Sequence, residues 1–161
     1  MKTWHTRHPE KEITDQAEMR EVVAGQKFLT LALCAESRPY LVTISHALDP
    51  ERNCLYFHCS PVGRKIDLIR TNPLVYGQVL EDRGYAAGEC DHHYRTVQFD
   101  GRAELVSDPE EKLHAFELLV DALEPDPEPV KEKMLSPARL EGVAIVRVTV
   151  TEWSGKKSGQ D

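Results

Sequence analysis

The chain has 161 residues, of which 40% are hydrophobic and 29% charged, as in an ordinary globular domain. Its net charge of -7 argues against nucleic acid or an anionic membrane as the main partner, because both require a basic surface. Residues 1–11 lack the apolar core of a signal peptide, and no apolar run approaches the ~20 residues of a membrane span. Its four scattered cysteines favour reduced thiols in a cytoplasm. We expect one domain over residues 1–161.

The first third of the chain predicts a helix and then three antiparallel strands. Residues 13–26 begin with Asp15 as a capping residue and carry a buried stripe at helical spacing, which is Met19, Val22 and Val23. Apolar and β-branched segments follow at residues 27–35, 40–48 and 54–59. The turns between them are short, so these strands are expected to form a meander.

The middle of the chain predicts a second helix and two longer strands. Residues 63–71 are helical in pattern, with Ile66 and Ile69 facing inward. Strands are expected at residues 74–81 and 94–106, joined by a loop at residues 82–93 that has no clear period. Gly101 interrupts the second of these strands, which predicts a bulge or sharp bend.

The last third predicts helices and one buried strand. Asp108 and Pro109 begin a helix whose apolar face is Leu113, Phe116, Val120 and Leu123. An exposed acidic loop, a weak helix and an apolar strand follow, at residues 124–129, 130–140 and 143–150. Residues 1–11 and 154–161 are expected to be flexible or partner-contacting tails. Six strands with helices at the corners favour a small antiparallel barrel, with a sandwich as the alternative.

Arg64 and Lys65 carry the strongest indication of chemistry. They begin a helix directly after a strand and a turn of small residues. A helix N-terminus offers unpaired backbone N–H groups and a partial positive charge, so it attracts anions and disfavours cations. Two cations at this position are electrostatically unfavourable, and a phosphate bound between them would offset that cost. The alternative is that both side chains are simply solvated.

The segment 58–73, HCSPVGRKIDLIRTNP, resembles the pyridoxamine 5'-phosphate oxidase-like FMN-binding split-barrel superfamily, and within it the branch related to nitroimidazole resistance proteins. Further matches occur in the same order along the chain, and they cover nearly all of it. They are EITD (12–15), RPYLVTIS (38–45), CDHHYRTVQFDGRAELVSDPEEK (90–112) and WSGKK (153–157). The first residue of WSGKK is more often Met in that branch.

The resemblance implies a mainly β fold, a six-stranded antiparallel Greek-key split barrel with flanking helices, which forms a homodimer. It further implies one FMN at each end of the subunit interface, with Arg64 and Lys65 on the phosphate. The other implied cofactor-binding residues are Thr43, Ile44, Ser45, His46, His58, Cys59, Thr96 and Trp153. Of these, Thr96 would lie near the phosphate and Trp153 would reach flavin from the partner subunit.

His58 is the one residue expected to be catalytic, because the resemblance links a histidine in this region to the active site. It would donate a proton near neutral pH, and the alternative is that it only shapes the pocket. Haem is the competing cofactor, with His46, His58, His92 or His93 as the axial ligand. Cys59, Cys90 and these histidines lack the spacing of a metal site, so no metal is expected.

These features favour an FMN-dependent oxidoreductase that reduces a small molecule or free flavin with a nicotinamide reductant. Pyridoxamine 5'-phosphate oxidation itself is disfavoured, because the tail lacks that enzyme's substrate-binding arginine pattern. A non-catalytic flavin- or haem-binding module and a structural dimer with an empty site are the other two hypotheses.

Overall fold

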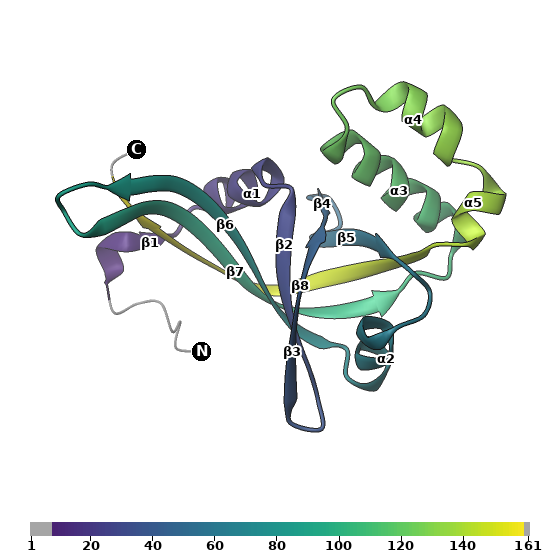
Figure 1. Ribbon diagram of the computed structural model, residues 1–161, viewed down its shortest axis with the longest axis horizontal. Helices are drawn as coiled ribbons and strands as arrows, with labels where there is room; N and C mark the ends of the chain where they lie inside the picture. Colours follow the sequence, from purple (N-terminus) through teal and green to yellow (C-terminus); the bar gives the residue numbers. More distant parts are fainter. Residues whose placement is uncertain (1–7, 160–161) are drawn as a thin grey trace.

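Antiparallel strands dominate the computed structural model, which describes residues 8–159 (Figure 1). The strands are β1 (Glu12–Ile13), β2 (Phe28–Ala35), β3 (Arg38–Ser45), β4 (Ala47–Asp49), β5 (Cys54–Cys59), β6 (Leu74–Ala86), β7 (Asp91–Leu105) and β8 (Ala144–Ser158). The helices are the short 3-10 helix Pro9–Lys11, α1 (Gln16–Gly25), α2 (Arg64–Thr71), α3 (Pro109–Leu123), α4 (Pro127–Met134) and α5 (Pro137–Glu141).

All strands belong to one curled sheet, in the order β3-β2-β6-β7-β8-β5-β4, with the short β1 paired to β8 (Figure 1). The predicted mainly β, antiparallel split-barrel class is confirmed. The predicted number of six strands is wrong, because seven strands follow one another in the described sheet. The strand expected at residues 40–48 is divided at His46, whose side chain turns inward and is buried between β3 and β4.

The pairing of β7 with β8 is shifted at Gly101, where a bulge or bend was predicted, and the extra residue of this bulge is Thr151 of β8. Asp100 pairs with Glu152 of β8, whereas the next residue, Gly101, pairs with Val150. A Cβ atom at Gly101 would lie 3.0 Å from the Thr149 carbonyl oxygen, so the two backbones approach too closely for a larger residue to fit without movement. The bend lets the sheet curl around its apolar interior.

The expected loop at residues 82–93 and the expected tail from residue 154 are both parts of the sheet. β6 continues to Ala86, β7 starts at Asp91, and β8 continues to Ser158 beside Tyr94 of β7. The extension was missed because these strands are largely exposed and lack apolar alternation. Backbone pairing and ion pairs such as Lys157 with Glu18 hold it instead. Residues 1–7 and 160–161 of the expected tails lie outside the described residues.

Two apolar clusters lie on the opposite faces of β5 and β8. Leu55 and Phe57 of β5 point into the larger cluster inside the curled sheet. Tyr56 of β5 and Ile145 of β8 point into the smaller one, beneath α3. The central position of β8 confirms the prediction that residues 143–150 lie between neighbouring strands. β5 therefore carries successive side chains to two different environments.

Helices α1, α2 and α3 pack against the sheet through their apolar residues. The predicted inward residues of α1 and α2 are buried. In α3, Phe116 and Val120 are buried, but Leu113 is 38% exposed, so the predicted apolar face is shorter than expected. Two helices, α4 and α5, replace the single helix expected at residues 130–140, and each has a proline in its first turn. None of the helices within residues 8–159 is both long and apolar enough to cross a membrane.

Candidate functional site

The N-terminus of α2 carries the two cations that the sequence singled out. Buried Ile66 and Ile69 anchor this helix on the sheet, which leaves its first turn at the surface. Gly63 precedes it with φ 129° and ψ 169°, a conformation that essentially only glycine adopts. No side chain of the described residues caps the helix. Its first N–H groups are therefore free to receive an anion.

Aromatic rings support both cations. The Arg64 guanidinium lies 4.5 Å from the centre of the Tyr40 ring of β3. The Lys65 ammonium lies 5.3 Å from the centre of the Phe57 ring of β5. Such contacts hold a cation in place without neutralising its charge. Three elements that are distant in sequence thus meet at this point.

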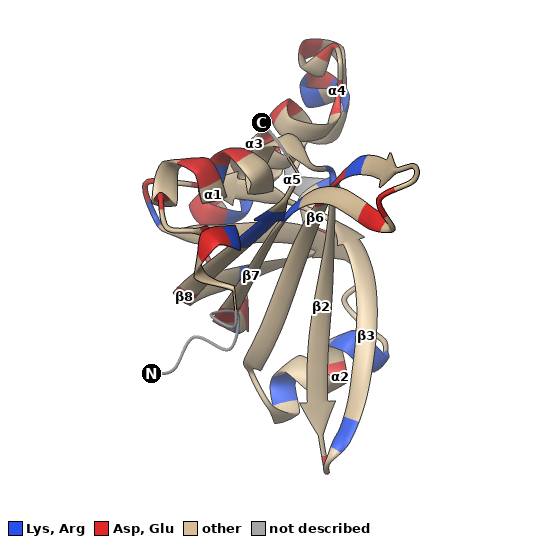
Figure 2. Cartoon of the chain, turned by 90° about the vertical axis from the view of Figure 1, so that its left-hand side faces the viewer, with Lys and Arg blue, Asp and Glu red and all other residues tan. Residues whose placement is uncertain are grey.

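The same two cations have no acidic partner among the ion pairs of residues 8–159. Within residues 8–159 neither Arg64 nor Lys65 forms an ion pair, whereas Arg95 and Arg147 each contact at least two carboxylates. Figure 2 shows Lys and Arg on α2 and at the neighbouring end of β3, and many of the acidic residues on α1 and on the helices at the other end. This end of the molecule therefore carries more basic than acidic side chains, although Asp67 also lies on α2.

A hollow of about 380 Å³ adjoins Arg64. It lies between α2 and the turn that joins β2 to β3, and Arg38 also lines it. The acidic side chains of Glu36 and Asp67 line the same hollow. The two carboxylates thus partly offset the charge of Arg38 and Arg64 on this side. The first turn of α2 is therefore the most favourable place for a phosphate.

The end of β3 divides its residues between two faces. Thr43 lies on the outer face of the sheet, where its hydroxyl is 3.3 Å from that of Thr30, and Ser45 shares this face. Ile44 and His46 are buried. His46 Nε2 donates to the Val23 carbonyl oxygen at 3.1 Å, and burial lowers the pKa of His46, so its ring is neutral at pH 7.

His58 and Cys59 end β5 on opposite faces. The His58 ring lies 5.7 Å from the Phe116 ring of α3, centre to centre. Desolvation and the charge of Lys65 lower the pKa of His58 below its ordinary 6.5. Cys59 is half-buried beside the larger apolar cluster, and burial raises the pKa of its thiol although Lys65 opposes the effect. Both groups are therefore largely uncharged at neutral pH.

Thr96 and Trp153 lie on the central strands. The Thr96 hydroxyl donates to the Val79 carbonyl oxygen at 3.1 Å, and Thr96 lines a hollow of about 330 Å³ together with Lys156. Trp153 Nε1 donates to Asn53 Oδ1 at 3.1 Å, and its ring lies 5.4 Å from that of Phe99. Within residues 8–159 neither side chain makes a hydrogen bond or ring contact with α2.

One chain therefore brings only part of the predicted set together. Arg64, Lys65 and Cys59 gather where β5 meets α2. His58 is near enough to Lys65 for that charge to lower its pKa, but its ring faces α3. Thr96 and Trp153 lie elsewhere on the sheet. Tyr40, which holds Arg64, was not expected from the sequence. It is part of the segment RPYLVTIS, but only the pairing of β2 with β3 places its ring on the inner face of the sheet.

A second missed feature is an apolar surface on the outer face of β2, β3 and β6. Its large side chains are 39% to 66% exposed, and they are Phe28, Leu41, Leu74, Tyr76 and Leu80. Thr43, Ser45 and Thr96 share this face through the strand register. Soluble monomers rarely leave such patches uncovered. We refer to these five residues as the outer apolar face.

The histidines considered as haem ligands differ in how exposed their rings are and in whether a ring nitrogen is already hydrogen-bonded. His46 is 2% exposed and bonded to backbone, and His92 Nε2 lies 2.8 Å from the Asp82 carboxylate. His58 is exposed beside Phe116. In the described part of the chain, no three His, Cys, Asp or Glu side chains gather closely enough to hold a metal ion.

Comparison with known proteins yields one family and many similar structures. The family described as pyridoxamine 5'-phosphate oxidase matches residues 15–157. An uncharacterized protein of Rhizobium meliloti (strain 1021) is 32% identical over 111 residues, which are 66% of this chain and 68% of that protein.

Two solved structures illustrate the shared fold. A candidate 5-nitroimidazole antibiotic resistance protein of Bacteroides thetaiotaomicron is 20% identical, with a TM-score of 0.76 over 91% of this chain and 86% of that one. An FAD and heme binding protein of Mycobacterium smegmatis is 16% identical, with a TM-score of 0.77 over 93% of this chain and 74% of that one. The superfamily inferred from the sequence is confirmed, and the chain belongs to the pyridoxamine 5'-phosphate oxidase family.

Proposed function

We propose that this chain is a flavoprotein that binds FMN, with the cofactor phosphate at Arg64, Lys65 and the first N–H groups of α2. The observation that carries the proposal is the pair of cations, each held against an aromatic ring, at a helix start that no side chain of residues 8–159 caps. Cations at a helix N-terminus each cost about 0.3–1 kcal/mol. Charge-assisted hydrogen bonds to a phosphate return about 1.5–3 kcal/mol each, so an anion makes the arrangement favourable.

The comparisons support a flavin over other phosphorylated ligands. The family is described as an oxidase of pyridoxamine 5'-phosphate, and the similar Mycobacterium smegmatis protein is described as binding FAD and heme. A bound flavin would supply electron or hydride transfer. The chain's own residues would hold the phosphate and shape the space beside Thr43, Ile44, Ser45 and His46. FAD and haem are the alternative cofactors.

A homodimer would complete the site. Thr96 and Trp153 lie apart from α2 in one chain, so a second copy is needed to bring such residues to the same flavin. The outer apolar face is the surface that we assign to this contact, because it is exposed and carries Thr43, Ser45 and Thr96 at its polar positions. Aromatic residues and apolar surface at its centre are typical of interfaces between copies.

The proposed activity is an oxidoreductase that takes electrons from a nicotinamide and passes them to a small molecule or free flavin. His58 is the proposed proton donor. Its lowered pKa means that the protonated ring is scarce at pH 7, so donation from His58 would be strongest at mildly acidic pH. The alternative role for His58 is to shape the pocket through its contact with Phe116.

Absorbance of the purified protein tests cofactor and activity in sequence. We expect a flavin spectrum, or uptake of added FMN in preference to FAD and haem, followed by bleaching on mixing with NADH or NADPH in a stopped-flow instrument. A Soret band without flavin uptake, or a colourless protein that takes up no flavin, would overturn the proposal. Reoxidation by a panel of acceptors then separates an enzyme from a binding module.

Light scattering after size-exclusion chromatography tests the dimer. We expect the wild-type chain to be a dimer and Leu41→Glu, on the outer apolar face, to be a monomer. Leu113→Glu is the matched control, because Leu113 is also an exposed leucine but lies on α3. A monomeric wild type would contradict the proposed dimer while leaving the phosphate site intact.

A further inference from the structure

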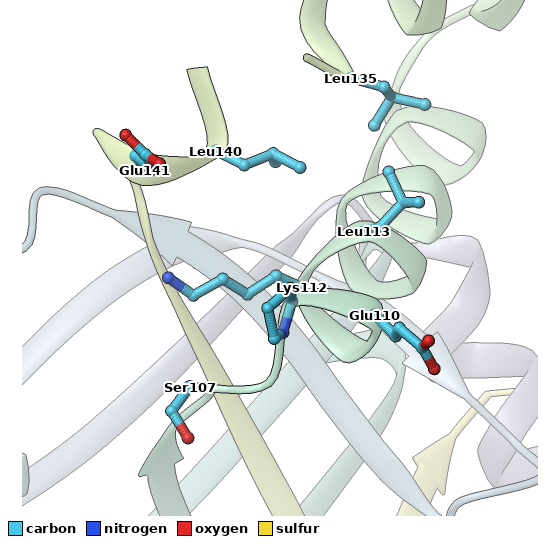
Figure 3. A pocket seen from close by; sticks show the side chains of 8 residues that line it. Ser107, Glu110, Lys112, Leu113, Leu135, Leu140 and Glu141 are labelled. Carbon is cyan, nitrogen blue, oxygen red and sulfur yellow. The ribbon is translucent and has the colours of Figure 1, made fainter. Parts of the chain in front are cut away.

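A hollow of about 410 Å³ lies between α3 and α5, and no residue of α2 lines it (Figure 3). This volume is within the range of ligand pockets, which is about 300–1,000 Å³. Leucines from three segments surround the space: Leu113 of α3, Leu135 after α4, and Leu140 of α5. Pro109 completes much of the apolar lining.

These three leucines face one another but remain partly exposed to solvent. Leu113 is 38% exposed although Phe116, three residues later on α3, is buried. Leu135 and Leu140 are half-buried, and α4 has no buried residue at all among those described. Figure 3 shows the side chains of Leu113, Leu135 and Leu140 directed toward the same space. An apolar group placed there would remove leucine surface from water, which is favourable.

Lys112 supplies a charge at the floor of this hollow. Its aliphatic stem extends along the floor in Figure 3, and its side chain is half-buried. Within residues 8–159 its ammonium forms no ion pair. The carboxylates of Glu110 and Glu141 are exposed and point away from the space in Figure 3. Both glutamates are lining residues of the hollow, but Lys112 is the charged side chain whose stem lies along its floor.

The geometry points to a binding site for a small apolar carboxylate, with its hydrocarbon body among Leu113, Leu135 and Leu140 and its carboxylate on the Lys112 ammonium. Two other ligand classes fit Lys112 and the leucines less well. A cationic amphiphile would meet Lys112 with like charge, and a highly polar anion would leave the leucines unfilled. The site is distinct from the phosphate site at α2, so flavin is not required for binding.

Isothermal titration with decanoate, 1-decanol and decylamine tests the ligand class. We expect decanoate to bind more tightly than the alcohol and far more tightly than the amine. Lys112→Gln should weaken decanoate binding about tenfold or more while leaving 1-decanol unchanged, because the alcohol makes no charge-assisted bond. Lys133→Gln is the matched control, since Lys133 is an exposed lysine of α4 outside the hollow. Equal affinities for all three ligands, or equal losses in both variants, would overturn the proposal.

Two further observations locate the binding and guard against misfolding. Leu113→Gln changes an exposed residue, so the variant is expected to fold, yet it should weaken decanoate and 1-decanol alike. Amide chemical shifts in the folded wild-type protein should move at residues 107–113 and 135–141 on adding decanoate. Shifts centred on the outer apolar face instead would overturn the assignment, and so would absence of binding.

Discussion

Replacing Gly77 with alanine should lower the free energy of unfolding, because the added methyl group would collide with the Phe99 ring. Gly77 of β6 is directly opposite Phe99 of β7. A Cβ atom at Gly77 would lie within 3.0 Å of three atoms of the Phe99 ring, closer than real Cβ contacts. Phe99 is 1% exposed and packs against Trp153, so its ring has little room to move. Overpacking of this kind costs about 1–3 kcal/mol.

Urea unfolding of the Gly77→Ala variant measures this cost directly, and thermal unfolding should show a fall in Tm of roughly 2–12 °C for a chain of this size. Gly25→Ala is the matched control, because no atom lies within 4 Å of its added Cβ, and it should be neutral or slightly stabilising. Adding Phe99→Leu to Gly77→Ala should restore part of the loss by relieving the clash. A Gly77→Ala variant as stable as Gly25→Ala, or strictly additive effects of the two changes, would refute the reasoning.

Four further changes test other parts of the structure. Gly63→Ala should strain the start of α2 by about 1–3 kcal/mol and weaken FMN binding in a titration, because φ 129° is unfavourable for alanine. Tyr56→Phe should lower the free energy of unfolding in urea by about 1 kcal/mol, because the buried hydroxyl donates to a carboxylate of α3. The hydrogen bond from Arg95 lowers the pKa of Glu81 below 4.5. The ionised carboxylate therefore stabilises the fold above pH 4.5, and this contribution is lost as pH falls through the lowered pKa. In urea unfolding, Glu81→Gln should be less stable than wild type at pH 7 and approach wild-type stability in acid. His58→Gln should keep its FMN affinity but lose the fall in rate that wild type shows as pH rises through the lowered His58 pKa, and an unchanged profile would leave His58 as a pocket residue only.

Local features of the sequence predicted where α2 begins and that two cations lie in its first turn. Gly63, Arg64 and Lys65 are adjacent in the chain, so the break between strand and helix and the misplaced cations were visible without tertiary structure. The bulge at Gly101 was equally local, because a glycine inside a strand typically marks a bulge or a close approach of two backbones. Both predictions depend on short-range backbone rules.

The remaining features depend on pairing across long stretches of sequence. The bond from Trp153 to Asn53 joins residues 100 positions apart, and only the strand register reveals it. Alternation along β5 shows that Phe57 and His58 face opposite ways, but it does not say which face meets α2 and which meets α3. The extended hairpin of β6 and β7 was missed for a different reason, since exposed strands held by backbone bonds leave no hydrophobic period.

The affinities of FMN and riboflavin for wild type, Arg64→Ala/Lys65→Ala and Arg70→Ala test the phosphate site most directly. Riboflavin lacks the phosphate, and Arg70 is a cation in the last turn of the same helix. We predict that the double variant weakens FMN about 100-fold or more and riboflavin by less than about threefold, from the loss of two charge-assisted bonds. Arg70→Ala should leave both affinities near wild type. Equal losses for FMN and riboflavin in the double variant, or no loss of FMN, would contradict the assignment of Arg64 and Lys65 to the flavin phosphate.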